Sequence, residues 1–137
     1  MKTLLFISAL VLSAAGTSHA QDIRQVNLNW TSSANINQAD HDTTSYACSF
    51  TTLKDQQLTW SQNNGADVTT YTVNSVDGAW TNVAVDGQIV YHVSSGQLSG
   101  DVTFSRNGGA PSLHVKLNLN GTPNFDFVFL IDTITQP

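Results

Sequence analysis

Five Asx-Gly pairs divide the chain into short segments, and this punctuation constrains the fold more than any other feature. The pairs are Asn64-Gly65, Asp77-Gly78, Asp86-Gly87, Asn107-Gly108 and Asn120-Gly121. Such pairs supply residues that adopt positive φ, as tight hairpin turns require. The segments between them alternate apolar with polar residues, which is typical of half-buried strands. The pattern therefore predicts an all-β domain.

The alternation predicts eight or nine antiparallel strands in one domain over residues 21–137, with 31–45 as a loop. The predicted strands lie near residues 23–30, 46–53, 57–61, 67–76, 79–85, 88–94, 101–106, 111–119 and 125–134. Consecutive hairpins form a small meander, either a barrel or a two-sheet sandwich. We slightly favour the barrel because closure removes exposed strand edges. In general architecture this resembles lipocalin-like barrels, although the first strand has no Gly-x-Trp signature.

The last three predicted strands allow a test of register. A turn from Asn107 to Ala110 places Phe104 opposite Leu113, and a five-residue turn from Asn120 to Asn124 places Leu117 opposite Phe127. Both turns, chosen independently, collect the apolar residues on one face. A one-residue slip at either turn would destroy that agreement. The sequence therefore predicts a three-stranded meander with one apolar face.

Two histidines fall on the polar face of the same region. If Val93 faces Val102, then His92 faces Thr103, which in turn faces His114. The two imidazoles would lie about 10 Å apart, two strand spacings. That separation is too long for one shared metal ion. We interpret both as solvated surface histidines.

The first 20 residues have the pattern of a secretory signal. A short positive start at Lys2 precedes an apolar run, and Ser18-His19-Ala20 is a small-x-small cleavage site. The apolar run is too short to span a membrane. Cys48 is the single cysteine, so no internal disulfide can form. We therefore expect an exported protein of a bacterial periplasm or exterior.

Charge excludes several partners. All ten acidic residues are aspartate, and the formal net charge of the whole chain is −5. After residue 20 the basic residues are Arg24, Lys54, Arg106 and Lys116. So acidic a chain with scattered cations is a poor ligand for nucleic acid or anionic membranes. We expect neither partner, no cofactor and no membrane span.

Aromatic residues on the inward face suggest a ligand cavity. In a barrel the same inward side chains form either a packed core or a cavity wall, depending on the volume left between them. The candidate ligand-binding residues are Phe104, Phe125, Phe127, Phe129, Trp80 and Tyr91. We therefore expect a binding protein that holds a small apolar ligand inside the barrel.

The alternative is a module that binds an extracellular protein or glycan. Val128 and Leu130 are apolar on the second face of the last strand, where a partner could dock. A strand with two apolar faces is otherwise central in a sheet or covered on both sides.

The sequence contains no established catalytic motif. Nucleophile elbow, zinc-protease and phosphate-loop patterns are all absent, so we do not expect an enzyme, although an unrecognised active site is the third hypothesis. Asp77 and Asp86 are explained as turn residues. The triplet Asp40-His41-Asp42 lies in the long predicted loop and is the one candidate metal site, although adjacent residues rarely converge on an ion.

Overall fold

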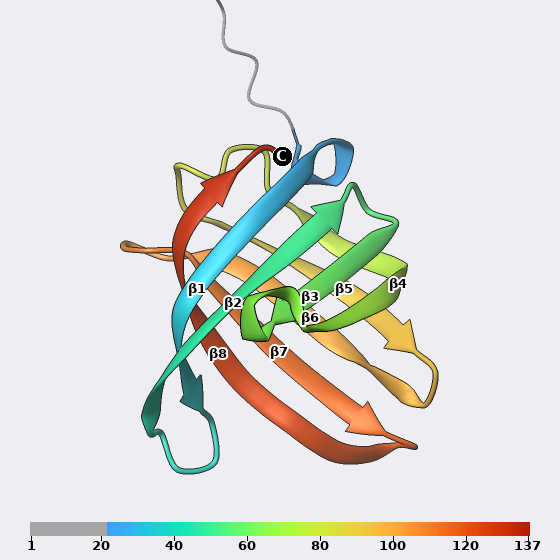
Figure 1. Ribbon diagram of the computed structural model, residues 1–137. Coiled ribbons are helices and arrows are strands. Elements are labelled where there is room, and N and C mark those ends of the chain that lie inside the picture. Colours follow the sequence, from blue (N-terminus) through green and yellow to red (C-terminus); the bar gives the residue numbers. More distant parts are fainter. Residues whose placement is uncertain (1–21) are drawn as a thin grey trace, which may run out of the picture.

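Eight antiparallel strands close into a single barrel in the computed structural model, which describes residues 22–137. The strands follow chain order around the barrel, and β8 returns to pair with β1 (Figure 1). The elements are η1 (Ile23–Gln25), β1 (Asn27–Asn37), β2 (Thr43–Leu53), β3 (Gln57–Gln62), η2 (Asn63–Gly65), β4 (Asp67–Ala79), β5 (Gly87–Ser95), β6 (Leu98–Arg106), β7 (Ser112–Leu119) and β8 (Thr122–Thr135). The predicted all-β meander and its closure into a barrel are confirmed. The predicted signal, residues 1–20, lies outside the described residues.

The interior is filled largely by apolar side chains from alternate strand positions. An eight-stranded barrel is just wide enough for its side chains to fill or to hold one small ligand. The buried apolar residues are Ile23, Leu28, Trp30, Phe50, Leu58, Trp60, Tyr71, Trp80, Ile89, Tyr91, Val93, Val102, Phe104, Leu113, Val115, Leu117, Phe129 and Ile131.

The two ends of the barrel differ. We call the end where β1 begins and β8 finishes the closed end, and the end that carries the β1–β2, β3–β4, β5–β6 and β7–β8 connections the mouth (Figure 1). At the closed end η1 and the β4–β5 connection fold over the barrel. The Ile23 amide donates to the Trp80 carbonyl at 3.1 Å, and the Trp80 Nε1 donates to the Val85 carbonyl at 3.0 Å. These bonds hold both segments as a plug.

The register of the last three strands is partly as predicted. Phe104 pairs with Leu113 between β6 and β7, which is confirmed. Between β7 and β8, however, Leu117 pairs with Phe125 instead of Phe127, a difference of two residues. A two-residue turn at Asn120-Gly121, with φ of 50° and 80°, replaces the predicted five-residue turn. The shorter turn alone shifts the pairing by three residues, and an irregularity between Leu117 and Asn118 takes up one of them. The net slip beyond that point is even, so the side chains there keep their predicted faces.

The β5–β6 connection is also shorter than predicted. A two-residue turn joins the strands where the expected register required an eight-residue loop, so His92 pairs with Asp101 and not with Thr103. Gly96, with φ of 58°, allows the tight turn. The predicted alignment of His92 with Thr103 is therefore wrong, whereas Thr103 does pair with His114.

The Asp77-Gly78 pair does not form a turn. Both residues lie within β4, where Gly78 has φ of 86° and pairs with Ile89. The predicted strand over 79–85 is wrong, since most of this segment belongs to the connection that plugs the closed end. An Asx-Gly pair supplies positive φ either in a hairpin turn or at a bend within a strand, so the pair alone does not identify a turn.

The predicted loop over 31–45 is mostly strand. β1 continues to Asn37 and β2 begins at Thr43. A β-bulge between Ser32 and Ala34 shifts the register of β1 against both of its neighbours. An extra residue reverses the inward and outward positions that follow it, so the period-two signal is lost there. The bulge therefore explains why residues 31–45 were predicted as a loop.

Candidate functional site

A cavity of about 270 Å³ opens at the mouth of the barrel. Its wall combines residues of β1, β2, β3 and β8. The lining residues are Asn35, Thr44, Tyr46, Trp60, Gln62, Phe125 and Phe127. The cavity exists because no segment comparable to the plug of the closed end lies across these side chains.

Aromatic rings form the apolar part of this wall. The ring centroids of Phe125 and Phe127 lie 4.3 Å apart and nearly parallel. Trp60 meets Phe125 edge to face at 5.3 Å and stacks on Phe50 at 5.4 Å. Such contacts fix the rings in place. Phe125 and Phe127 remain only half-buried, so their apolar surface is available to a ligand.

Four neutral polar side chains complete the wall of the cavity, those of Asn35, Thr44, Tyr46 and Gln62. The Tyr46 hydroxyl donates to the Gln62 Oε1 across β2 and β3. Asn35 of β1 is 7% exposed, and its cross-strand partner is Phe129 of β8, which is fully buried. Because the bulge in β1 precedes it, Asn35 shares the inward face with Phe129. The Asn35 carboxamide is thereby placed beside the aromatic rings of the cavity wall.

Two titratable side chains of β2 lie in or near the cavity: Tyr46 belongs to its lining, and Cys48 lies one inward position further along the strand. Burial raises the pKa of the Cys48 thiol to about 11, and the nearby Trp60 indole offsets this only in part. Burial also raises the pKa of the Tyr46 hydroxyl, with further contributions from Cys48 and Asp67. Both groups therefore stay protonated at neutral pH, and neither is an activated nucleophile.

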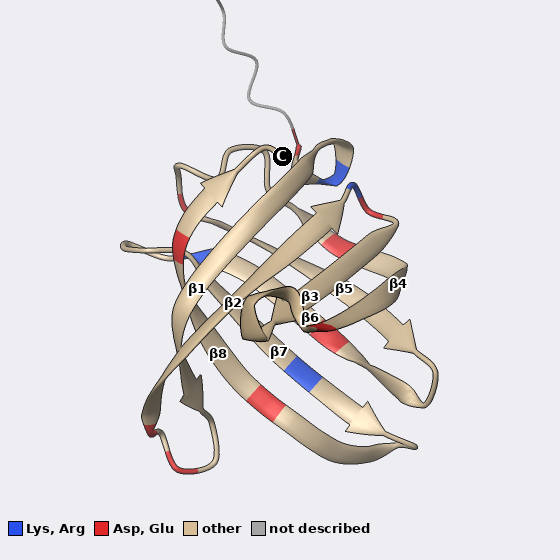
Figure 2. Cartoon of the chain, in the orientation of Figure 1, with Lys and Arg blue, Asp and Glu red and all other residues tan. Residues whose placement is uncertain are grey.

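No charged side chain lines the cavity, but the mouth around it is acidic. Asp40 and Asp42 lie in the β1–β2 connection and Asp67 begins β4. Arg24 and Lys54 lie at the opposite end, in η1 and in the β2–β3 connection (Figure 2). Lys116 of β7 lies toward the mouth, beside Phe125 and Phe127, and its strand partner is the acid Asp126 of β8. The field at the mouth therefore disfavours anionic ligands.

The six candidate ligand-binding residues are divided between the two ends. Phe125 and Phe127 line the cavity, and Phe129 lies directly behind them, in contact with Trp60 at 5.5 Å. Phe104 belongs instead to the packed interior toward the closed end, where it meets Trp30 at 4.8 Å.

Trp80 and Tyr91 also belong to the packed interior. Trp80 meets Trp30 at 6.0 Å, and Tyr91 meets Phe104 at 5.1 Å. Both side chains are at most 2% exposed. Half of the predicted set therefore packs against other aromatic rings, away from the residues of the mouth cavity.

Sequence reasoning missed five residues of the cavity wall. Asn35 and Thr44 fell in the segment predicted as a loop, and Tyr46, Trp60 and Gln62 lie on the strands that flank the β2–β3 turn. The alternation of Tyr46, Cys48 and Phe50 was a usable signal for the inward face of β2. The position of Asn35 had no such signal, because the bulge interrupts the period.

The triplet Asp40-His41-Asp42 forms a loop with internal hydrogen bonds. The Asp40 carboxylate accepts from the Asp42 amide at 3.0 Å and from the Asn37 Nδ2 at 3.5 Å, and His41 has φ of 60°. All three side chains are exposed. Within residues 22–137 no three histidine, cysteine or acidic side chains converge as metal ligands.

His92 joins three strands on the outside of the barrel. Its Nε2 lies 2.6 Å from the Asp77 Oδ2, and its Nδ1 lies 2.6 Å from the Asp101 Oδ1. These hydrogen bonds, with Asp77 first and Asp101 second, raise the pKa of His92. Asp77 therefore has a role on the surface of β4, which its assignment to a turn had hidden.

Val128 and Leu130 lie on the outer face of β8. They pair with Ile36 and Ala34 of β1, and Leu130 is 39% exposed. The four side chains form a short apolar strip, which we call the seam strip, along the β1–β8 closure. Both strands are paired on each side, so the strip offers side chains and no free strand edge.

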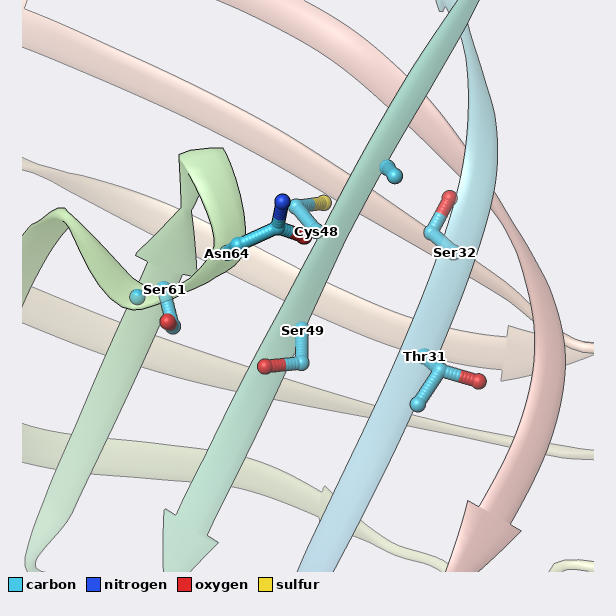
Figure 3. Close-up of a pocket in the computed structure, with 8 residues that line it drawn as sticks. Thr31, Ser32, Cys48, Ser49, Ser61 and Asn64 are labelled. Carbon is cyan, nitrogen blue, oxygen red and sulfur yellow. The ribbon is translucent and has the colours of Figure 1, made fainter.

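A second hollow lies on the outside of β1, β2 and β3, beneath η2 (Figure 3). It has a volume of about 310 Å³ and is lined by Thr31, Ser32, Ala47, Cys48, Ser49, Ser61, Asn64 and Gly65. These are small and largely polar side chains with no aromatic ring. The mouth cavity is the better candidate because it has an apolar wall with a few placed polar groups, as small-molecule sites do.

Comparisons with known proteins give no relative. No protein-family model, no curated protein and no solved structure matches the chain. Each of the two helical segments between residues 22 and 137 has three residues, so no helix in this part of the chain could cross a membrane.

Proposed function

We propose that this protein is an exported, non-enzymatic binding barrel that holds one small apolar molecule in its mouth cavity. The observation that carries the proposal is the half-buried aromatic wall at the open end of a barrel whose other end is plugged and packed. A binding role is favoured over catalysis because Tyr46 is the one titratable residue in the cavity lining and its raised pKa keeps it protonated.

Native mass spectrometry of the protein purified from its own host after export tests the proposal. We expect an excess mass that disappears on denaturation. Phe127→Ala removes a cavity ring and should lower affinity about tenfold, from the loss of roughly 1.5 kcal/mol of apolar contact. Val128→Ala, the adjacent residue on the outer face, is the matched control and should retain the bound mass. A bare protein, or equal loss in both variants, contradicts the proposal.

The second candidate is a module that binds a protein or glycan through the seam strip. The partial exposure of Leu130 beside Val128 favours it. Sedimentation of the wild type and of Leu130→Asp tests this function. A dimer or complex that dissociates in the variant would support it, and a wild-type monomer that captures no partner would contradict it.

A further inference from the structure

The polar groups of the mouth cavity indicate the class of ligand, provided that the proposed binding function holds. We propose that the cavity selects a neutral molecule of a single aromatic ring with a carboxamide-like polar group, and that this group pairs with the carboxamide of Asn35. Size, charge and an unpartnered polar group on β1 each contribute to this assignment.

Size restricts the ligand to about one ring. The cavity volume of about 270 Å³ lies just below the range of about 300–1,000 Å³ that is typical of small-molecule pockets. A single ring with a short substituent fits within such a space, whereas a long acyl chain would extend out of the mouth into solvent. Phe127 and Phe125 are rings against which another ring can stack or meet edge to face.

Charge restricts the ligand to a neutral one. Neither a lysine nor an arginine lines the cavity, so a carboxylate would lose its hydration without gaining a partner. The acids Asp40, Asp42 and Asp67 at the same end repel an anion further, and the nearby Lys116 of β7 is offset by its strand partner Asp126. A cation has no carboxylate among the lining residues either.

Asn35 supplies the polar recognition. Its neighbours on β1, Ser32 and Asn37, have hydrogen-bond partners, whereas the Asn35 carboxamide has none among residues 22–137. Within these residues the Trp60 Nε1 is the one side-chain atom that is both sealed from solvent and unpartnered. The Asn35 carboxamide is therefore reached from outside, through the cavity that it lines.

A carboxamide offers one acceptor and one donor side by side. A ligand with the same pair can therefore form two hydrogen bonds with Asn35. Because the Asn35 carboxamide is open to the cavity, water can occupy its hydrogen-bonding positions until a ligand replaces that water. A β-bulge that turns such a group inward is the kind of feature found next to active sites. The bulge between Ser32 and Ala34 is what turns Asn35 toward the cavity.

Three probes of the same shape test the assignment: benzamide, benzoate and isopropenylbenzene. Their affinities for the wild type and for Asn35→Leu would be measured by calorimetry. Leucine keeps nearly the same volume and removes both hydrogen-bonding groups. We expect the affinity ratio of benzamide to isopropenylbenzene to fall about tenfold or more in Asn35→Leu, which corresponds to two neutral hydrogen bonds. We expect benzoate to bind at least about tenfold more weakly than benzamide to the wild type.

A second measurement does not depend on a variant. In the ¹⁵N-labelled wild type, benzamide should shift the side-chain amide signals of Asn35, and isopropenylbenzene should shift them less. The amide signals of Asn74, which lies on the outside of β4 and bonds to Ser94, should not move. These signals separate contact at Asn35 from a general change in folding.

The outcomes distinguish the assignment from the function on which it rests. An unchanged affinity ratio in Asn35→Leu, or unshifted Asn35 signals, overturns the role of Asn35 while apolar binding stands. Benzoate binding as tightly as benzamide overturns the neutral class. If no probe binds and the exported protein carries no excess mass, the binding function itself falls.

Discussion

The two ends of this barrel are built from the same kinds of residue and differ in what covers them. At the closed end Trp30, Trp80 and Phe104 pack together beneath η1 and the β4–β5 connection. At the mouth Phe125 and Phe127 stack on each other and stay half-buried beside a cavity. An inward aromatic residue therefore contributes to a core or to a cavity wall according to whether a covering segment reaches it.

The largest expected effect contrasts one ring from each end. Phe104→Ala should destabilise the protein by about 3–5 kcal/mol, because it leaves a cavity among fully buried rings. Phe127→Ala should cost only about 1 kcal/mol, since that ring is already half exposed. Urea unfolding of both variants measures the difference. Equal losses would mean that the mouth belongs to the packed core.

A second change tests the plug of the closed end. A Cβ added at Gly87 would overlap the Cδ1 of Trp80, whose indole is buried and hydrogen-bonded. Gly87→Ala should therefore displace Trp80 and destabilise the fold by about 1–3 kcal/mol. Gly109→Ala meets no atom within 4 Å and is the control. Thermal unfolding of the two variants should separate them, and equal stability would show that the plug is not tightly packed.

The smallest effect concerns the outer surface, where solvent reaches the charges. The raised pKa of His92 means that its protonated form is favoured in the folded state. Its stabilisation is therefore fully present below the unfolded pKa of about 6.5 and is lost as pH rises through the higher folded pKa. At pH 5.5, His92→Gln should reduce the free energy of unfolding by at most about 1 kcal/mol. At pH 8.5 the reduction should be smaller than at pH 5.5.

Removing the two carboxylates that bond to His92 tests whether they cause this dependence of stability on pH. The double variant Asp77→Asn, Asp101→Asn should show the same weakened dependence of unfolding free energy on pH. Urea unfolding between pH 5.5 and 8.5 would compare the three proteins. A pH dependence that persists in both variants would assign it to other groups.

Predictions made from the sequence succeeded where they depended only on the alternation of inward and outward positions along a strand. The apolar face of β6, β7 and β8 was predicted correctly because the net slip between β7 and β8 is two residues from Leu117 onward, which leaves Phe125 and Phe127 facing inward. Predictions failed where one residue is inserted or where an Asx-Gly pair has two uses. The bulge after Ser32 concealed half of β1, and the bend at Gly78 was interpreted as a turn.

The candidate site was predictable only in part for the same reason. Phe125 and Phe127 followed from alternation, but Asn35 lies beyond the bulge, and the burial of Trp80 depends on a bond to Ile23 far away in the sequence. No local pattern encodes such a contact.

The sequence by itself determined the all-β class, the meander and the inward face of its last strands, because turn chemistry and period-two alternation are local properties. Only the tertiary structure decided that β1 closes on β8 and that a plug covers one end. It also decided that Asn35 lines the mouth cavity and that His92 bonds to Asp77. These features depend on hydrogen bonds and packing between residues distant in the chain, whose geometry is set only when the barrel closes.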